Sequence, residues 1–278
     1  MKRRVSDILL KVIINLFVLT LSISCIFPVV WMFYSSFKTN KEFNLNIISL
    51  PSHLQFDNYE NAIKNGNLLI PFLNSIFATV VSVIFVIILG FLIAFCLARY
   101  SFKGRNFIYV LLLFGMLIPI HSLLVPLFIE FKAIGLVDTH FTLIPPYIAF
   151  GLPMAVFLYE SFLKSTPIEV EESAFIDGSS LLSMIFKIVM PICRPVIATS
   201  LILTFLNSWN EFPFALVLLN SPRMMTIPVA LTNFNGQYTV NYPQLLSAMV
   251  IAVLPVVLIY LGFSKSVIKG MTAGSVKG

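Results

Sequence analysis

Long apolar stretches without charge, separated by short polar segments, dominate the pattern of this chain. Val12 to Phe37 carries no charged residue, and neither does Leu68 to Ala98. A helix of about 20 apolar residues crosses a hydrocarbon layer roughly 30 Å thick, so each stretch is long enough for one crossing. The pattern therefore predicts membrane-spanning helices rather than the half-buried helices of a water-soluble domain.

The same pattern predicts six spans, at approximately residues 8–37, 70–98, 106–131, 141–160, 185–210 and 244–264. Lys187 and Arg194 interrupt the fifth span near one end, where long basic side chains can extend to the interface. The first span resembles a secretory signal, but its apolar run is too long and ends without a cleavage site, so we expect it to be retained. The expected fold is an all-α integral membrane protein, a single domain over residues 1–278.

Composition agrees with this interpretation, since 58% of residues are hydrophobic and 11% are charged, with a mean hydropathy of +0.95. The net charge of +6 is scattered over short loops and both ends, which favours topology signals over nucleic-acid binding. With the N-terminus inside, 13 of the 18 Lys and Arg residues fall in cytoplasmic segments. Short cytoplasmic loops collect basic residues, so both ends are expected in the cytoplasm. Cysteines and histidines show no clustered spacing, so we expect no metal site.

The segment between spans four and five, residues 165–191, carries the most specific pattern. Thr166, Pro167 and Glu169 form a capping-box sequence with proline at the first helical position, which predicts a helix start. Gly178 should end this helix after about three turns, and a second short helix should follow from Ser180 to about Met190. Ile168, Ala174 and Phe175 can share an apolar side of the first helix.

On physical grounds alone this segment is either an amphipathic connector at the membrane surface or a knob that docks into another protein. The residues Glu172-Ser173-Ala174, then Gly178, Ile188 and Met190-Pro191, resemble the EAA motif of ABC importer permeases. Its usual form is Glu-Ala-Ala, three residues, Gly, nine residues, Ile, any residue, Leu, Pro. Ser173 and Met190 depart from that form, and both replacements preserve approximate size.

Further resemblances run along the whole chain. The segments Pro28–Lys38, Trp209–Phe212, Thr226–Leu231 and Lys269–Gly278 are similar to the MalG-type permeases of carbohydrate ABC importers. This resemblance implies a sugar as the transported solute, and a multi-pass protein of the bacterial cytoplasmic membrane. It also implies three kinds of partner besides lipid, namely a second, MalF-like permease, a cytoplasmic ATPase dimer, and an extracytoplasmic sugar-binding protein.

The resemblance also implies which residues couple this chain to the ATPase. The expected coupling residues are Glu172, Ser173, Ala174, Phe175, Ile176, Asp177 and Gly178, with Pro167 and Ile168 in support. Lys277 and Gly278 are second-rank candidates, because the tail of such permeases reaches toward the ATPase. The chain has no Gly-x-x-x-x-Gly-Lys-Ser/Thr loop to hold phosphates, so ATP and Mg²⁺ are expected on the partner subunits and no catalytic residue or cofactor is expected here.

Four polar residues in or beside the spans are candidates for the substrate path: Asn74, Asn207, Asn210 and Glu211. An ionisable group such as Glu211 near a span suggests function, but an interfacial anchor is equally reasonable at the end of span five. Asn74 could instead tie helices together. The alternatives to a sugar importer are a permease for another solute such as a glycerol phosphate, an ion-driven secondary transporter, and a membrane scaffold without transport. The absence of acidic residues within 68–98 and 244–264 disfavours the ion-driven mechanism.

Overall fold

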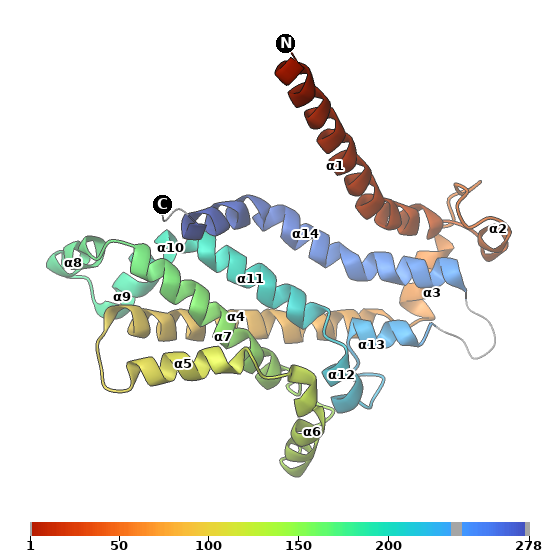
Figure 1. The fold of residues 1–278 in the computed structure, drawn as a ribbon. Helices are drawn as coiled ribbons and strands as arrows, with labels where there is room; N and C mark the ends of the chain where they lie inside the picture. The colour runs from red at the N-terminus through yellow and green to blue at the C-terminus, as the bar shows by residue number, and fades with distance from the viewer. Residues whose placement is uncertain (1, 235–240, 276–278) are drawn as a thin grey trace. The chain divides into compact units, whose positions relative to one another are not determined.

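The computed structural model describes the backbone of residues 2–234 and 241–275, and the side chains of residues 10–234 and 241–263. Within these ranges the structure is helical and contains no strand. The chain divides into two compact units (Figure 1). Unit 1 comprises residues 1–68 and 231–253, and unit 2 comprises residues 69–230 and 254–278.

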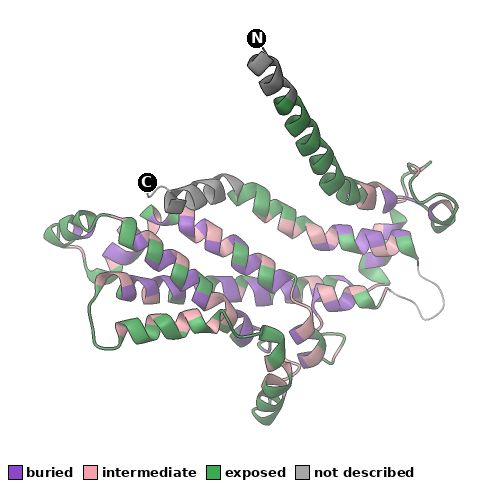
Figure 2. Cartoon of the chain, viewed as in Figure 1, coloured by how far each residue is buried: buried purple, intermediate pink, exposed green. Residues whose placement is uncertain are grey.

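Three long helices form the centre of unit 2: α4 (Leu69–Arg99), α7 (Ile144–Ser165) and α11 (Arg194–Trp209). Figure 2 shows buried residues concentrated on α4 and α7. Apolar side chains from all three helices, including the fully buried Val86, Val156 and Tyr159, share a core. At Gly90 a Cβ would lie 3.1 Å from the Cβ of Ala155, so this glycine lets α4 approach α7 closely. Small residues at such crossings are typical of helix packing in membranes.

Within the described residues, four helices are long and apolar enough to cross a membrane: Leu10–Ser35 of α1 (Lys2–Ser35), α4, α7, and Tyr242–Phe263 of α14 (Tyr242–Ser275). The expected third span consists of α5 (Arg105–Gly115), the 3₁₀ turn η1 (Ile120–Leu123) and α6 (Leu124–Ala133), bent by 91°. The expected fifth span is bent by 82° between Leu181–Ile192 and Arg194–Trp209. The bends lie beside Pro119 and between Pro191 and Pro195, since proline lacks the N–H that a helix interior needs. The part of the chain that the structure describes therefore has four candidate spans, or up to six if each bent pair is one span.

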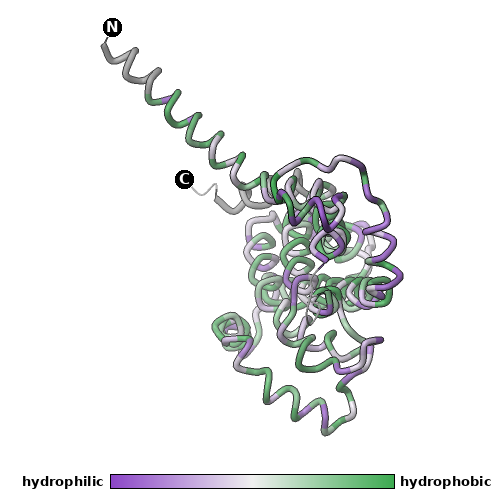
Figure 3. The backbone as a smooth tube through the Cα atoms, turned by 90° about the vertical axis from the view of Figure 1, so that its right-hand side faces the viewer, coloured by the Kyte–Doolittle hydropathy of each residue, from purple (hydrophilic) through white to green (hydrophobic). Residues whose placement is uncertain are grey.

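The short helices of unit 2 gather at its two ends (Figure 1). At one end lie α8 (Glu169–Ile176), α9 (Leu181–Met184), the π-helix η2 (Ile185–Val189) and α10 (Met190–Ile192). At the other end lie α6, α12 (Pro213–Leu218) and the start of α13 (Ile227–Thr232). Figure 3 shows hydrophobic residues along the long helices and hydrophilic ones in the connecting segments. The segment 165–191 forms one of these ends, and Asn210 and Glu211 lead into α12 at the other.

Unit 1 contains α1, α2 (Asn40–Leu45), α3 (Asp57–Lys64) and the first part of α14. A buried lysine organises its loop. Lys38 is 0% exposed, and its Nζ donates to the carbonyls of Asn46 (3.2 Å) and Ile47 (2.8 Å) while lying 5.4 Å from the ring centroid of Tyr34. Burial lowers the pKa of Lys38, and the nearby Glu42 carboxylate opposes that shift. Carbonyl oxygens and an aromatic face together replace the water that this ammonium group loses.

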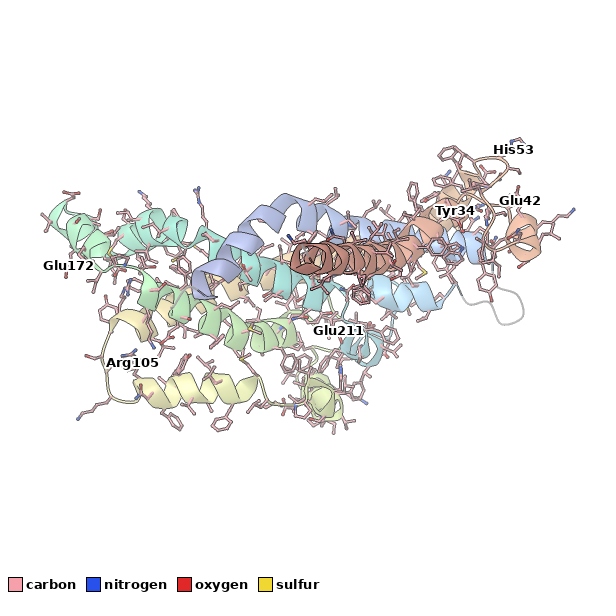
Figure 4. The ribbon with its side chains drawn as sticks, turned by 45° about the horizontal axis from the view of Figure 1, so that its top comes forward. Tyr34, Glu42, His53, Arg105, Glu172 and Glu211 are labelled. Atoms are coloured by element: carbon pink, nitrogen blue, oxygen red, sulfur yellow. The ribbon has the colours of Figure 1, made fainter. Side chains whose placement is uncertain are left out.

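Glu42 holds the same loop together through a capping box, and this predicts how unit 1 responds to acid. Its carboxylate accepts hydrogen bonds from Ser52 and from the backbone N–H of Thr39, which lower its pKa to about 2 from 4.5 (Figure 4). A depressed pKa means that the stabilisation is complete above pH 4.5 and is lost as pH falls through about 2.

The fluorescence of Trp31 can be used to follow changes in this loop, because the Nε1 of Trp31 donates to the carbonyl of Ile47 at 3.0 Å. In a Trp209→Phe background Trp31 is the one remaining tryptophan of the 2 in the chain. We expect its fluorescence emission to stay constant from neutral pH down to 4.5, and Glu42→Gln to shift it already at neutral pH. An emission transition centred near pH 4.5 in the chain with Glu42 intact would contradict the depressed pKa.

Candidate functional site

The first half of the segment 165–191 forms α8, but the helix does not begin as the sequence suggests. The Thr166 hydroxyl donates to the carbonyl of Phe162 at 3.1 Å and so closes the end of α7. The residue that caps α8 is Ile168, which forms no side-chain capping bond. The capping-box prediction is therefore wrong, because the preceding helix takes the threonine. As a result α8 spans 8 residues rather than about three turns.

Gly178 ends α8 as expected, and it does so through its backbone conformation. Its φ is +81°, in the left-handed region, and a Cβ placed there would meet no atom within 4 Å. The N–H of Gly178 donates to Phe175 O (3.0 Å) and that of Ser179 to Ala174 O (3.0 Å). These two bonds form a Schellman motif, which satisfies the last carbonyls of the helix. Glycine is needed here for its φ rather than for lack of space.

The turn leads into a second helical segment that begins at Ser180, as expected. The Ser180 hydroxyl accepts from the N–H of Ser183 at 3.4 Å, and the segment then runs through α9, η2 and α10. A π-helix inside this segment was not expected. Inserted π turns recur at functional sites because they shift the side chains that follow by one position.

Most of the expected coupling residues lie on the surface of unit 2. Ile176 is 86% exposed and Phe175 51%, and Ser173, Asp177, Gly178 and Glu172, the last labelled in Figure 4, are exposed as well. Ala174 is 5% exposed and belongs to the core, so α8 packs onto the bundle through this residue. The expected apolar side of Ile168, Ala174 and Phe175 is therefore divided between core and surface.

An ion pair joins α8 to α4. Arg99 Nε donates to Glu171 Oε1 at 2.7 Å, and Arg99 Nη2 donates to the carbonyl of Thr166 at 3.1 Å. The two side chains are 9% and 8% exposed. Neither residue stands out by sequence pattern, although opposite charges at the same expected membrane face are a signal that could have suggested the pair.

At the other end of unit 2 an open cavity of about 390 Å³ lies between α7, α11 and the segment leading into α12. Asn207, Asn210 and Glu211 line it, so the structure brings together three of the four substrate-path candidates. Tyr147, Phe150 and His121 also line it and were not predicted. An apolar wall with a few convergent polar groups is the usual composition of a small-molecule site.

Glu211 has a structural task in this cavity. Its carboxylate accepts hydrogen bonds from Phe214 N (2.6 Å), Ala215 N (3.1 Å) and the Tyr147 hydroxyl (3.1 Å), so it caps the start of α12 and links it to α7 (Figure 4). Burial raises the pKa of Glu211, and the hydrogen bonds from Phe214, Ala215 and Tyr147 oppose this shift.

Asn74 lies apart from this cavity. Its Nδ2 donates to the carbonyls of Arg223 (2.8 Å) and Met225 (3.0 Å), and the neighbouring Ser75 hydroxyl accepts from Ile227 N at 2.8 Å. Together they anchor the segment before α13 to α4, the tying role considered above for Asn74. The remaining candidates, Lys277 and Gly278, lie outside the described residues.

Known proteins are similar to this chain over most of its length. A diacetylchitobiose uptake system permease protein of Streptomyces coelicolor is 36% identical over 91% of this chain and 85% of its own length. An arabinooligosaccharides transport system permease protein of Bacillus subtilis is 34% identical over 96% of both chains. These identities extend across both units rather than only over the segment 165–191.

The fold is also found in a solved structure, a bacterial ABC transporter involved in the import of the acidic polysaccharide alginate. One of its chains matches with a TM-score of 0.81 over 94% of this chain and 97% of its own, at 22% sequence identity. Residues 86–272, which include the coupling segment and the cavity, match a single family of membrane proteins. This chain belongs to the family of binding-protein-dependent transport system inner membrane components.

Proposed function

We propose that this chain is a permease subunit of an ATP-dependent, binding-protein-dependent sugar importer that works by alternating access. The observation that carries this proposal is the named activity of its relatives, which include permeases for diacetylchitobiose and arabinooligosaccharides at 36% and 34% identity. Because these relatives align over nine tenths of the chain or more, their shared solute class is the best guide to this one.

The proposed coupling site is the exposed part of α8 and the turn after it, with Glu172, Ser173, Phe175, Ile176, Asp177 and Gly178 at the surface. Ala174 supports them from the core. Exposed Phe175 and Ile176 beside an acidic residue offer an apolar contact and a charge to an ATPase subunit. In this proposal the six spans are those of the sequence, each bent helix pair counting as one, and α8 faces the cytoplasm.

The energy for transport would come from partners. We propose that two ATPase subunits bind ATP and Mg²⁺, that a second permease completes the pathway, and that an extracytoplasmic binding protein delivers the sugar. Alternating access requires two arrangements of the spans, and the binding of nucleotide shifts their relative populations. A shift from 1:99 to 99:1 takes about 5.5 kcal/mol of differential binding.

The cavity of about 390 Å³ is the proposed part of the substrate path within this chain. Glu211 is occupied by its three hydrogen bonds, whereas the exposed side chain of Asn207 can offer both amide groups to sugar hydroxyls. Tyr147 and Phe150 add aromatic surface next to these polar groups.

This predicts the effect of Asn207→Ala on transport by the assembled complex. One lost hydrogen bond is worth about 0.5–1.5 kcal/mol, so we expect the concentration for half-maximal uptake to rise about two- to tenfold. The control is Asn220→Ala, which removes another exposed amide that does not line the cavity. Equal uptake kinetics for Asn207→Ala and Asn220→Ala would remove the cavity from the substrate path.

The proposed function is tested by uptake of labelled solutes into vesicles that carry the whole complex. The panel includes oligosaccharides, monosaccharides and a glycerol phosphate, each with its binding protein and with or without ATP inside. Accumulation of a sugar only with ATP supports the proposal. Accumulation driven by an ion gradient without ATPase would replace it with secondary transport, and accumulation of the glycerol phosphate alone would change the solute.

A further inference from the structure

The guanidinium of Arg99 lies where three helices of unit 2 meet. Arg99 is the last residue of α4, Thr166 follows the last residue of α7, and Glu171 lies in the first turn of α8. Arg99 bonds both of the others, at 2.7 Å to the Glu171 carboxylate and 3.1 Å to the Thr166 carbonyl. One side chain therefore cross-links the ends of two long helices and the helix of the coupling segment.

On its N-terminal side α8 is joined to α7 by a short connection. Residues 166–168 join the two helices, and Thr166 has extended backbone angles (φ −88°, ψ 130°). Such a connection can act as a hinge, because a few residues at a helix end absorb large changes in backbone angle. The bond from Arg99 to Glu171 spans this connection and restrains it from the α4 side.

The burial of the pair argues for a positional role. Arg99 and Glu171 are 9% and 8% exposed and lie near the buried core residue Cys193. Replacing a buried ion pair with well-packed apolar side chains is often neutral or stabilising, so stability alone does not require the charges. The planar guanidinium of Arg99 does fix the orientation of α8 relative to the ends of α4 and α7, because it binds its two acceptors in a set geometry.

We propose that Arg99 and Glu171 are positioning residues that make α8 move as one body with the ends of α4 and α7, so that displacement of α8 by a partner reaches the long helices. The inference rests on the proposed function, in which α8 docks on an ATPase. It concerns contacts within this chain, behind the docking surface.

The first test compares the sugar transported per ATP hydrolysed in the assembled complex. Single substitutions leave one buried charge without its partner and can misfold, so the informative variant is Arg99→Met with Glu171→Met, which keeps approximate volume. We expect this double variant to assemble and hydrolyse ATP, with the ratio lowered about tenfold. The control is Glu169→Gln, an exposed carboxylate on the same helix. If the double variant transports as much sugar per ATP hydrolysed as the unmutated chain does, the proposal is overturned.

The second test measures whether α8 and α4 move together. Cys96 is exposed on α4, and Glu169→Cys adds an exposed site on α8 outside the proposed docking residues, in a Cys25→Ser background with Cys193 buried. The distance between spin labels at 96 and 169 should be the same with and without ATP in the otherwise unmutated chain. In the variant with Arg99→Met and Glu171→Met, the distribution of this label distance should broaden or shift.

A label distance that changes with nucleotide while Arg99 and Glu171 are intact would show that the link is not rigid. This measurement needs only a bound ATPase, and no sugar. If the complex binds ATPase but imports no sugar, the proposed function fails while the link is still tested. If sugar import is normal but the label distance changes with nucleotide, only the proposed link through Arg99 and Glu171 is refuted.

Discussion

Gly178→Val should lower ATP-dependent uptake by at least tenfold while the complex still assembles. Gly178 has φ +81°, a conformation that costs other residues roughly 1–2 kcal/mol and β-branched ones more. The turn would relax toward negative φ, and the coupling residues on both sides of it would lose their relative positions. The measurement is uptake per assembled complex in vesicles. Gly178→Asn should retain most of the uptake, because asparagine tolerates the left-handed region.

Gly135→Val is the matched control for this substitution. Gly135 also has positive φ (+70°) and open space around a Cβ, but it follows α6 at the opposite end of unit 2. It carries the same strain without touching the coupling segment. Equal loss of uptake for both valine variants would attribute the effect to general destabilisation, and equal loss for Gly178→Asn would attribute it to side-chain bulk.

Ile176→Asp should weaken binding of the ATPase subunits by about 30-fold or more and leave the stability of this chain unchanged. Ile176 is 86% exposed, so the fold gains little from its side chain. A buried apolar anchor at an interface is worth about 2 kcal/mol or more, which corresponds to that loss of affinity. Binding of purified ATPase to the permease complex in nanodiscs measures it directly.

Ile48→Asp provides the comparison, because Ile48 is 68% exposed but belongs to the loop of unit 1. It should change ATPase binding by less than twofold. Undiminished binding for Ile176→Asp would exclude this side chain from the docking surface, and a lowered melting temperature would indicate a role within the fold instead.

The sequence predicts the helical class, the long helices and the Gly178 turn, because each depends on a local pattern. Charge-free stretches locate α4 closely and place α1 and α7 with less exact ends, and a glycine after an amphipathic turn gives the end of α8. The coupling residues could be placed only by resemblance. Their exposure follows from packing, which the sequence pattern does not contain.

The sequence misses two kinds of feature: a residue for which two helices compete, and contacts between residues that are far apart in the chain. Thr166 could cap either of two helices, and the end of α7 takes it. The Arg99–Glu171 pair joins residues 72 positions apart, and the Tyr147–Glu211 bond joins residues 64 apart. No local pattern distinguishes such partners from other polar residues. The bends beside Pro119 and Cys193 are similarly hidden, because membrane helices often continue through a proline.

The discontinuity of unit 1 has a consequence for biosynthesis. Its two pieces, residues 1–68 and 231–253, are separated in the chain by most of unit 2, and contacts such as Ser247 Oγ to Ser36 O (3.1 Å) and the stacked rings of Phe43 and Tyr242 join them. During translation from the N-terminus, α1 and its loop leave the ribosome long before their partners exist. Their apolar surfaces must stay in lipid until the start of α14 is made, so unit 1 can be completed only after residues 69–230 of unit 2 have been synthesised, although its own synthesis begins first.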